Sequence, residues 1–423
     1  VLLVGSVMRG VGPIVCCIVV EAIFTARSNL PLAEETSTFQ LYAKDAPQCH
    51  ELTSVNEIDF TLVTQLSQNR LWMMKHHCQR YPHPMSIAVY TNDTLQQTNH
   101  ELVRLGCDLN LVAVSVVDAR TVGSPEEYPV NLLRNLALTK VRTSHIIYID
   151  VDFWASENLY QVLKSSPTIP SALLKDPKLA LVLPAFMLFR QCVDYKDCRK
   201  NNIPLMPKNK RDLLEMMVNK RGHIFDPTNR GGHGSTLYKD WIRQDPGSLY
   251  PIDCLQSHRY EPFVVIRWCR DLPPFQEAFN GYGKNKLTWM MHVIRRGYKL
   301  SQVGGAFLVH YPHLDSDART KWNEAPDVLK IPLRDNTIQI RRPKKSDGNL
   351  NLETFKRGQV DRLFVDFRKW LEESVPDTSR MGMCDQAQDD DSKLWLDKVD
   401  QKASAAKANA KAAAILKDNA RIE

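Results

Sequence analysis

The sequence lacks the motifs that most directly indicate a nucleotide or metal site. No G-x-G-x-x-G follows the first predicted strand and no G-x-x-x-x-G-K-[ST] occurs anywhere, which excludes the dinucleotide fingerprint and the P-loop. No C-x-x-C pair is present, so nothing indicates a zinc or redox centre of that kind. If the protein binds phosphate, other residues must neutralise the phosphate charge.

Basic charge is also limited. The chain has 55 Lys and Arg against 48 Asp and Glu, and much of the surplus lies in short runs such as residues 341–345. No aromatic residues are interleaved with these runs, so we expect no nucleic-acid partner. A net charge of +7 would equally suit a small phosphate-bearing substrate.

Long apolar runs are scarce. The uninterrupted stretch 10–20 is too short to span a bilayer without its flanks. We interpret residues 1–26 as a candidate signal-anchor or transmembrane segment, with a buried helix or strand as the alternative. The polar residues 27–56 then form a linker, and the rest of the chain lies in a lumen.

The ten cysteines are compatible with an oxidising lumen. Cys192 and Cys198 flank a polar segment that could close as a small disulfide loop, and Cys254 and Cys269 form another conceivable pair. Free buried thiols are the alternative.

From residue 57 onward, strand-like and helix-like stretches alternate. This alternation predicts an α/β fold with a mostly parallel central sheet and flanking helices. We place the folded domain at residues 57–376 and a polar, partly helical tail at 377–423. The predicted elements include strands 60–64, 85–90, 109–117, 146–149, 179–186, 260–266 and 306–313, and helices 67–81, 92–106, 128–142, 287–295 and 364–371.

Two carboxylates follow the apolar strand 146–149. Asp150 and Asp152 would point to one side of the chain at period two, close enough to share a divalent cation. Ligands collect at the carboxyl ends of strands in such sheets. An isolated Asp-x-Asp is more often a solvated turn or a cap, but the aromatic pair Phe153-Trp154 that follows favours a site.

Three later features supply groups that could take part in a reaction or bind a ligand. Glu261 stands at the head of an apolar strand, the Gly-rich turn 279–286 leads into a helix, and His310 ends another apolar strand. A lone histidine there is usually structural, yet its imidazole would complete a site that offers two acids. The Gly-rich turn 231–236 either approaches a ligand or is an ordinary surface loop.

The predicted helix 128–142 presents Asn131, Arg134 and Asn135 on one polar face, just ahead of the acid-bearing strand. These side chains either contact a base, ribose or diphosphate, or form a solvated face.

Taken in order, these segments resemble the LARGE-type glycosyltransferases and the related β-1,4-glucuronyltransferase. The resemblance covers residues 58–322. It implies a GT-A type nucleotide-sugar-binding fold, a UDP-sugar donor, and Mn²⁺ held by Asp150, Asp152 and His310. His313 competes with His310 for the third place.

The resemblance also implies transfer of a sugar, most simply glucuronic acid with inversion, to a glycan or glycoprotein acceptor. A base must then accept the proton of the acceptor hydroxyl, and we select Glu261, with Asp253, Asp271 and Glu277 as alternatives. Lys286 or Lys284 would help to neutralise the diphosphate. The donor-binding set that we predict is Asn131, Arg134, Asn135, Asp150, Gly281, Asn285 and Lys286.

Members of this family usually lie in the Golgi membrane with a luminal catalytic domain, which agrees with the apolar start of the chain. Retaining transfer of another UDP-sugar such as xylose is one alternative, and a non-catalytic glycan-binding member is another. The presence of Asp150, Asp152 and His310 argues against a non-catalytic protein.

Overall fold

The computed structural model describes residues 38–122, 127–190, 195–324, 329–332, 338–341 and 354–385. The predicted signal-anchor 1–26, Cys192 and the tail beyond residue 385 lie outside this part of the chain. The described residues from Phe39 onward belong to one compact unit. No helix among the described residues is long and apolar enough to cross a membrane.

The helices and strands of this unit alternate in much of its first half. The helical elements are η1 (Val55–Glu57), η2 (Gln68–Met73), α2 (Met74–Arg80), α3 (Leu95–Arg104), α4 (Val130–Leu138), α5 (Leu159–Ser165), α6 (Thr168–Lys175), α7 (Tyr195–Asn202), η4 (Ile203–Leu205), α8 (Lys210–Val218), α9 (Arg230–His233), α10 (Tyr238–Arg243), α11 (Asn285–Arg295), α12 (Asp317–Asn323) and α13 (Lys356–Ser374). The strands are β1 (Phe60–Ser67), β2 (Met85–Thr91), β3 (Val112–Asp118), β4 (His145–Tyr148), β5 (Phe153–Ala155), β6 (Leu179–Leu183), β7 (Ala185–Leu188), β8 (Gly222–Ile224), β9 (Leu249–Ile252), β10 (Cys254–Leu255), β11 (Phe263–Arg267), β12 (Lys299–Val303), β13 (Leu308–His310), β14 (Leu329–Pro332), β15 (Ile338–Arg341) and β16 (Gly382–Met383).

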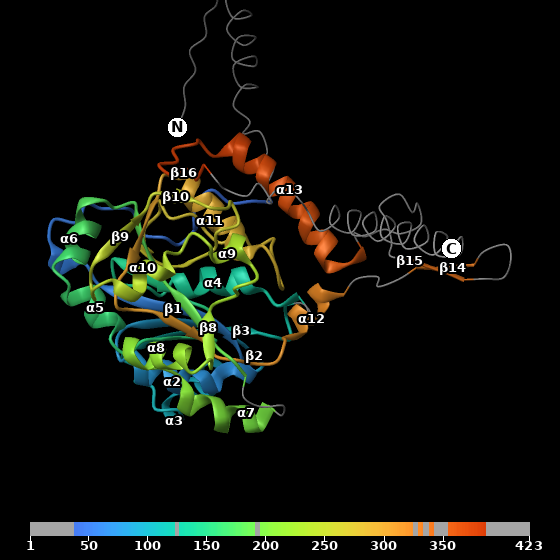
Figure 1. Ribbon diagram of the computed structural model, residues 1–423, viewed down its shortest axis with the longest axis horizontal. Helices are drawn as coiled ribbons and strands as arrows, with labels where there is room; N and C mark the ends of the chain where they lie inside the picture. The colour runs from blue at the N-terminus through green and yellow to red at the C-terminus, as the bar shows by residue number, and fades with distance from the viewer. Residues whose placement is uncertain are drawn as a thin grey trace, which may run out of the picture. The chain divides into compact units, whose positions relative to one another are not determined.

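The largest sheet among the described residues has eight strands in the order β3-β2-β1-β4-β11-β6-β12-β9. Strands β3, β2, β1 and β4 are mutually parallel, β11 runs antiparallel to both of its neighbours, and β12 pairs parallel with β6. Helices α2 and α3 lie on one face and α4 and α11 on the other (Figure 1). The predicted α/β fold with a mostly parallel central sheet and flanking helices is confirmed.

Both faces of this sheet are buried, which explains the nearly continuous apolar strands. In β4, Ile147 packs with the cluster on the α2 side, whereas Ile146 and Tyr148 pack with the cluster on the α4 side. The same alternation places Ile87 and Ala88 of β2 in different clusters. Side chains at period two therefore form two separate hydrophobic cores.

A smaller four-stranded sheet, in the order β5-β13-β7-β8, positions the residues that follow the Asp-x-Asp turn. We predicted one strand over residues 179–186, but the chain forms β6 in the large sheet and β7 in the small one, with Pro184 between them. Proline has no N–H to donate to a continuing ladder. This change of sheet was not visible in the apolar pattern.

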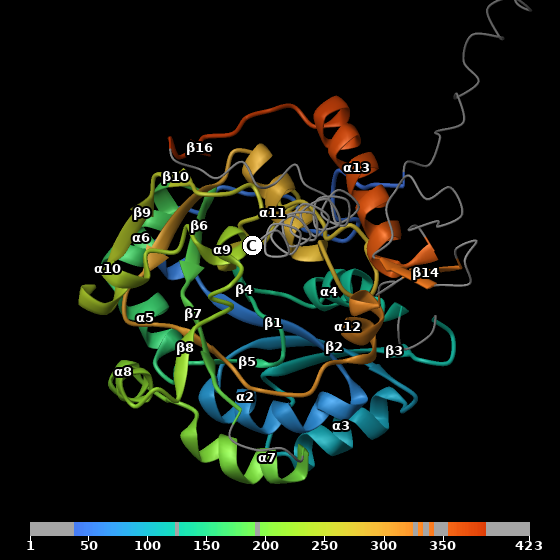
Figure 2. The same cartoon turned by 45° about the vertical axis from the view of Figure 1, so that its right-hand side comes forward.

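Helix α13 is longer than the predicted helix 364–371. Its buried face includes Val360, Phe364, Phe367 and Leu371, and this face packs with Phe39 in a third hydrophobic cluster. Figures 1 and 2 both show α13 beside α11. Phe39, near the start of the described chain, therefore packs against a helix near its end.

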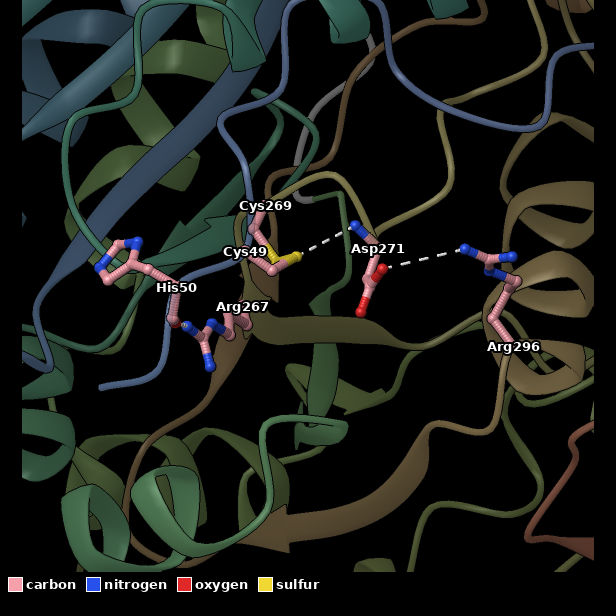
Figure 3. The surroundings of a disulfide bond; sticks show 6 residues. All are labelled: Cys49, His50, Arg267, Cys269, Asp271 and Arg296. Carbon is pink, nitrogen blue, oxygen red and sulfur yellow. Dashed lines mark hydrogen bonds and ion pairs between the residues drawn. A yellow bond between two sulfur atoms is a disulfide. The ribbon is translucent and has the colours of Figure 1, made fainter. Parts of the chain in front are cut away.

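Disulfides fix both ends of the described chain to the centre. Cys49 is bonded to Cys269 and Cys254 to Cys384, so the predicted Cys254–Cys269 pair is wrong. Around the first bond, the backbone N–H of Asp271 donates to Cys49 Sγ at 3.3 Å and Arg296 lies 4.0 Å from the Asp271 carboxylate (Figure 3). Sequence spacing alone could not select these pairs, because each partner lies more than a hundred positions away.

Two further disulfide bonds involve other cysteines. Cys78 is bonded to Cys107, and Cys198 is also disulfide-bonded. The predicted partner of Cys198, Cys192, lies outside the described residues. The disulfides are compatible with the oxidising compartment expected from the sequence.

Candidate active site

The Asp-x-Asp segment forms a tight turn between β4 and β5. Phe153 N–H donates to the Asp150 carbonyl at 2.9 Å, so the chain has already left the strand and the period-two argument no longer applies. The buried imidazole of His77 lies 2.7 Å from the Val151 carbonyl, and Tyr311 N–H donates to the Asp152 carbonyl at 2.7 Å. The turn is therefore held from two sides, by α2 and by the residue after β13.

Strand pairing explains how distant histidines reach this turn. β13 runs antiparallel to β5 with His310 opposite Phe153, the residue that follows Asp152. His310 Nε2 lies 3.9 Å and His313 Nε2 lies 2.8 Å from Asp152 Oδ2. The ligand atoms of Asp152, His310 and His313 all lie within 4.8 Å of one another. Both histidines that competed in the sequence therefore lie beside Asp152.

Asp152 also accepts a hydrogen bond from Arg70, at 2.7 Å. Burial alone would raise the pKa of Asp152, but the hydrogen bond from His313 and the charge of Arg70 hold this pKa well below its usual range. Burial lowers the pKa of His310 to about 4. The carboxylate is therefore ionised and His310 is neutral at physiological pH, as metal ligands must be.

Asp150 has a different set of neighbours. Arg134 lies 3.0 Å and Lys286 3.2 Å from its two carboxylate oxygens, and Tyr148 donates to it at 2.6 Å. Burial would raise the pKa of Asp150, but the charges of Lys286 and Arg134 lower it. Arg134 itself is buried and also donates to the Tyr148 hydroxyl. Asp150 therefore links α4 to α11 through two cations.

Both aspartates line a cleft of about 1850 Å³. The predicted residues that also line it are Arg134, Glu261, Gly281, Lys284, Asn285, Lys286, His310 and His313. They come from α4, from the turn before α11 and the start of α11, from the segments before β11 and after β13, and from β13 itself. The fold thus brings together residues from the whole length of the domain.

The Gly-rich turn before α11 directs its two lysines to different partners. Gly281 and Gly283 have positive φ angles of 68° and 103°, and a Cβ at Gly283 would meet the Trp322 ring at 2.2 Å. Lys284 pairs with Asp361 of α13 at 3.0 Å. Lys286 is the lysine that reaches the acid turn.

Glu261 also lines the cleft, and its surroundings differ from those of Asp150 and Asp152. Among the described residues, its carboxylate has no hydrogen-bond partner. Burial, followed by the negative charge of Asp150, raises the pKa of Glu261, although Lys286 opposes this shift. The alternative bases Asp253, Asp271 and Glu277 do not line the cleft.

Asn131 and Asn135 do not line the cleft either. Asn131 donates to the Gln276 carbonyl at 2.7 Å, and Asn135 donates to the Phe275 carbonyl at 2.8 Å. Asn131 also accepts from Arg134 at 2.8 Å. In this structure the two asparagines hold the loop before α11 against α4 and orient Arg134.

Sequence reasoning missed Arg70 and Tyr148. Tyr148 is the last residue of β4, two positions before Asp150, so its closeness in sequence to the acids could have identified it. Arg70 lies in the 3-10 helix η2, where no motif or period marks it. Only the packing of η2 beside the turn brings this guanidinium to Asp152.

Comparisons with known proteins agree with this geometry. Residues 109–328, just over half of the chain, match the family model described as "Glycosyl-transferase for dystroglycan". The LARGE2s xylosyl- and glucuronyltransferase of Danio rerio is 31% identical over 279 residues, which is 63% of this chain and 33% of that protein. The LARGE2 xylosyl- and glucuronyltransferase of Mus musculus is 31% identical over 293 residues, which is 68% of this chain and 38% of that protein.

The chain spans about a third of the length of these curated relatives. A crystal structure of GalNAc-T7 with UDP, GalNAc and Mn²⁺ aligns with a TM-score of 0.36 and 14% identity, over 63% of this chain and 48% of that one. This structural likeness is too weak to support an inference. The family match, however, covers the acid turn, the Gly-rich turn and both histidines, so the resemblance to LARGE-type enzymes is confirmed. The chain belongs to the family described as glycosyltransferases for dystroglycan.

Proposed function

We propose that this protein is a metal-dependent glycosyltransferase that moves a sugar from a UDP-sugar to a glycan acceptor. The observation that carries the proposal is the convergence of Asp152, His310 and His313 beside the Asp150–Lys286 pair in one cleft. Glucuronic acid is the sugar that we propose, because the matching relatives are named xylosyl- and glucuronyltransferases and the sequence resembles the glucuronyltransferase-type domain.

The donor atoms around Asp152 fit a divalent cation. His313 Nδ1 lies 2.6 Å from the Leu314 carbonyl, which only accepts, and 3.3 Å from the Arg70 guanidinium, which only donates. We assign the shorter contact as the hydrogen bond of Nδ1, so in the neutral ring Nε2 carries a lone pair. That lone pair would face the Asp152 carboxylate at 2.8 Å, and a proton or a cation must separate the two. A hydrogen bond from the far nitrogen to a carbonyl is also how proteins orient metal-binding histidines.

One carboxylate and two imidazoles suit Mn²⁺ among other divalent metals, so we propose Asp152, His310 and His313 as its ligands. A further role of Asp150 at the metal stays a prediction. When bound, the ion would act as a Lewis acid that offsets the negative charge on the departing UDP.

The cationic side chains of the cleft would hold the donor diphosphate. Lys286 is fixed by Asp150 at 3.2 Å and by the Phe263 ring, whose centre lies 3.9 Å from Nζ. Because it is already positioned, Lys286 can stabilise phosphate charge without being ordered at the moment of reaction. Arg134, buried beneath Asp150, keeps that carboxylate in place.

Glu261 is the base that we propose for an inverting transfer. It lines the same cleft, and its raised pKa increases its affinity for the proton of the acceptor hydroxyl. Asp150 and Asp152 are occupied by cations or imidazoles, so neither is as well placed to accept a proton. Glu261 would accept the hydroxyl proton as the acceptor oxygen attacks the sugar.

We also propose a Golgi location with the catalytic domain in the lumen. The disulfides of the described chain support an oxidising compartment. Membrane attachment through residues 1–26 stays a prediction, since those residues lie outside the described part of the chain.

A UDP-release assay tests the proposed activity. The purified protein is incubated with UDP-glucuronic acid, UDP-xylose or other UDP-sugars, with added Mn²⁺ or with EDTA. We expect release of UDP that requires Mn²⁺ and increases when a suitable glycan is added. Mn²⁺-dependent binding of UDP without turnover of any donor would favour a glycan-binding member, and unchanged activity in EDTA would exclude the metal.

A further inference from the structure

The turn Gly231-Gly232-His233-Gly234, which the proposed mechanism leaves unused, presents a buried histidine to the cleft. His233 is 6% exposed and lines the cleft. Within the described residues its imidazole has no hydrogen-bond partner. Because the residue lines the cleft, its ring is available to pair with a ligand that enters there.

At two glycine positions of this turn, an added side chain would collide with other atoms of the turn. A Cβ at Gly232 would meet the Asn229 side chain at 2.6 Å, and a Cβ at Gly234 would meet the Arg230 carbonyl at 2.4 Å. Asn229 accepts from Gly232 N–H at 3.2 Å and from Arg259 at 3.1 Å. The turn is therefore compact, and two of its four residues, Gly232 and His233, are buried, unlike those of an ordinary surface loop.

The position of His233 identifies the part of the donor that it would meet. The backbone carbonyl of Gly232 accepts from Glu261 N–H at 3.0 Å, so the histidine adjoins the proposed base. On the other side it adjoins Lys286, whose charge affects its pKa, and the Phe225 ring, 5.0 Å away between centres. Both views draw α9 close to α11 (Figures 1 and 2). In a UDP-sugar bound in the cleft, the part that lies between the diphosphate and the proposed base is the sugar.

The charge state of His233 indicates which kind of ligand group its ring can bind. Burial, followed by the charge of Lys286, lowers the pKa of His233 to about 3, so the ring is neutral. A neutral imidazole has one donor and one acceptor nitrogen, which matches a hydroxyl group. A phosphate or carboxylate oxygen would use only the donor.

We propose that His233 is a specificity-determining residue that hydrogen-bonds a hydroxyl group of the transferred sugar. The inference rests on the proposed function, because it requires a UDP-sugar in the cleft. It assigns recognition of the uridine diphosphate and of the sugar to different residues, Lys286 and His233.

The test compares binding of UDP with binding of UDP-glucuronic acid and UDP-xylose to the full chain, by calorimetry with Mn²⁺ present. His233→Phe removes the hydrogen bonds and keeps a ring. We expect the affinity for the UDP-sugar that binds best to fall about ten-fold, while the affinity for UDP stays within about two-fold. His233→Asn, which keeps one donor and one acceptor, should restore part of the loss.

The matched control is His292→Phe. His292 is also buried with both ring nitrogens unpartnered among the described residues, but it does not line the cleft. This variant should leave the ratio of the two affinities unchanged.

Equal weakening of UDP and UDP-sugar by His233→Phe would show a merely structural role, and no change in either affinity would also overturn the inference. Failure of the proposed function is a different result, in which the wild-type chain binds no UDP. Failure of the His233 inference alone leaves UDP binding by the wild-type chain intact.

Discussion

Asp150 and Asp152 are separated by one residue, yet their surroundings differ in chemistry. Asp150 contacts two permanent cations and a hydroxyl, whereas Asp152 contacts two imidazoles and one guanidinium. A carboxylate that is already neutralised by Arg134 and Lys286 has little charge left for a metal. Imidazoles, in contrast, are themselves metal ligands.

The comparison shows that one short motif can hold two electrostatic roles. On the Asp152 side, neutral ring nitrogens would complete the coordination of an ion. On the Asp150 side, the carboxylate fixes Lys286, which would face the donor. Substitutions on the two sides of the turn should therefore have different effects.

The largest effect is expected from replacing the aspartates one at a time. Asp152→Asn should reduce Mn²⁺ affinity by more than about 100-fold, since even residues behind the ligands cost 10- to 100-fold when changed, and should reduce donor turnover by about 10³-fold or more. Asp150→Asn should change Mn²⁺ affinity by less than about ten-fold. Metal titration by calorimetry measures both variants.

Asp118→Asn is the control, because Asp118 also pairs with an arginine at 2.7 Å but does not line the cleft. An equal loss of metal affinity in Asp150→Asn and Asp152→Asn would place both carboxylates on the ion and abolish the distinction.

The pH dependence of turnover should depend on Asp150. Glu261 must be ionised to accept a proton, so kcat/KM should fall as the pH drops through its pKa, which is raised by burial and Asp150 and opposed by Lys286, Arg259 and Arg134. Glu261→Gln should lose on the order of 10² to 10³ in turnover while retaining UDP affinity.

Replacing Asp150 removes a negative charge near Glu261 and should therefore move the acid limb of the pH profile to lower pH. A pH series of Asp150→Asn measures this shift. A profile whose acid limb stays in place would separate Glu261 from the Asp150 side of the turn.

Lys286→Met should weaken binding of UDP about 10- to 100-fold, because hydrogen bonds to charged groups contribute about 1.5–3 kcal/mol. Affinity for Mn²⁺ alone should change little, since Lys286 pairs with Asp150 rather than Asp152. Calorimetry with UDP and with Mn²⁺ separates the two affinities. Lys299→Met, at an exposed position outside the cleft, is the control, and an unchanged UDP affinity in Lys286→Met would remove this lysine from the donor site.

The smallest effect concerns Arg70, which shares the Asp152 oxygen with the histidines. Arg70→Gln removes a positive charge next to the proposed metal ligands, so Mn²⁺ affinity should rise, by about two- to ten-fold. The same titration measures it. A weaker affinity would mean that Arg70 holds Asp152 in a binding conformation instead of competing with the ion.

The apolar patterns predicted much of the fold. Strands β1, β2, β3 and β4 and helix α11 lie within a few residues of their predicted positions, because buried strands and amphipathic helices have strong local periods. Helix α3 begins later than predicted, at Leu95, because Thr94 and Gln97 form a capping box. Strand β12 was missed, since its sequence Lys299-Leu300-Ser301-Gln302-Val303 is short and half polar.

The sequence predicted which residues form the candidate site better than it predicted the contacts that they make. Asp152, His310, Glu261 and Lys286 were all selected from the sequence, and all line one cleft. The partners of Asn131 and Asn135 were not predicted, because they are backbone carbonyls of a loop far along the chain. A side chain cannot reveal by its own type whether it faces a ligand or a carbonyl.

By itself, the sequence determined which residues carry charge, imidazoles and apolar periods, and therefore the α/β class and the list of candidate ligands. Only the tertiary structure decided that Lys284 pairs with Asp361 while Lys286 reaches Asp150, and that Arg70 joins Asp152. The reason is physical: local periodicity sets secondary structure, whereas the partner of a charged side chain depends on strand register and packing between segments far apart in the chain.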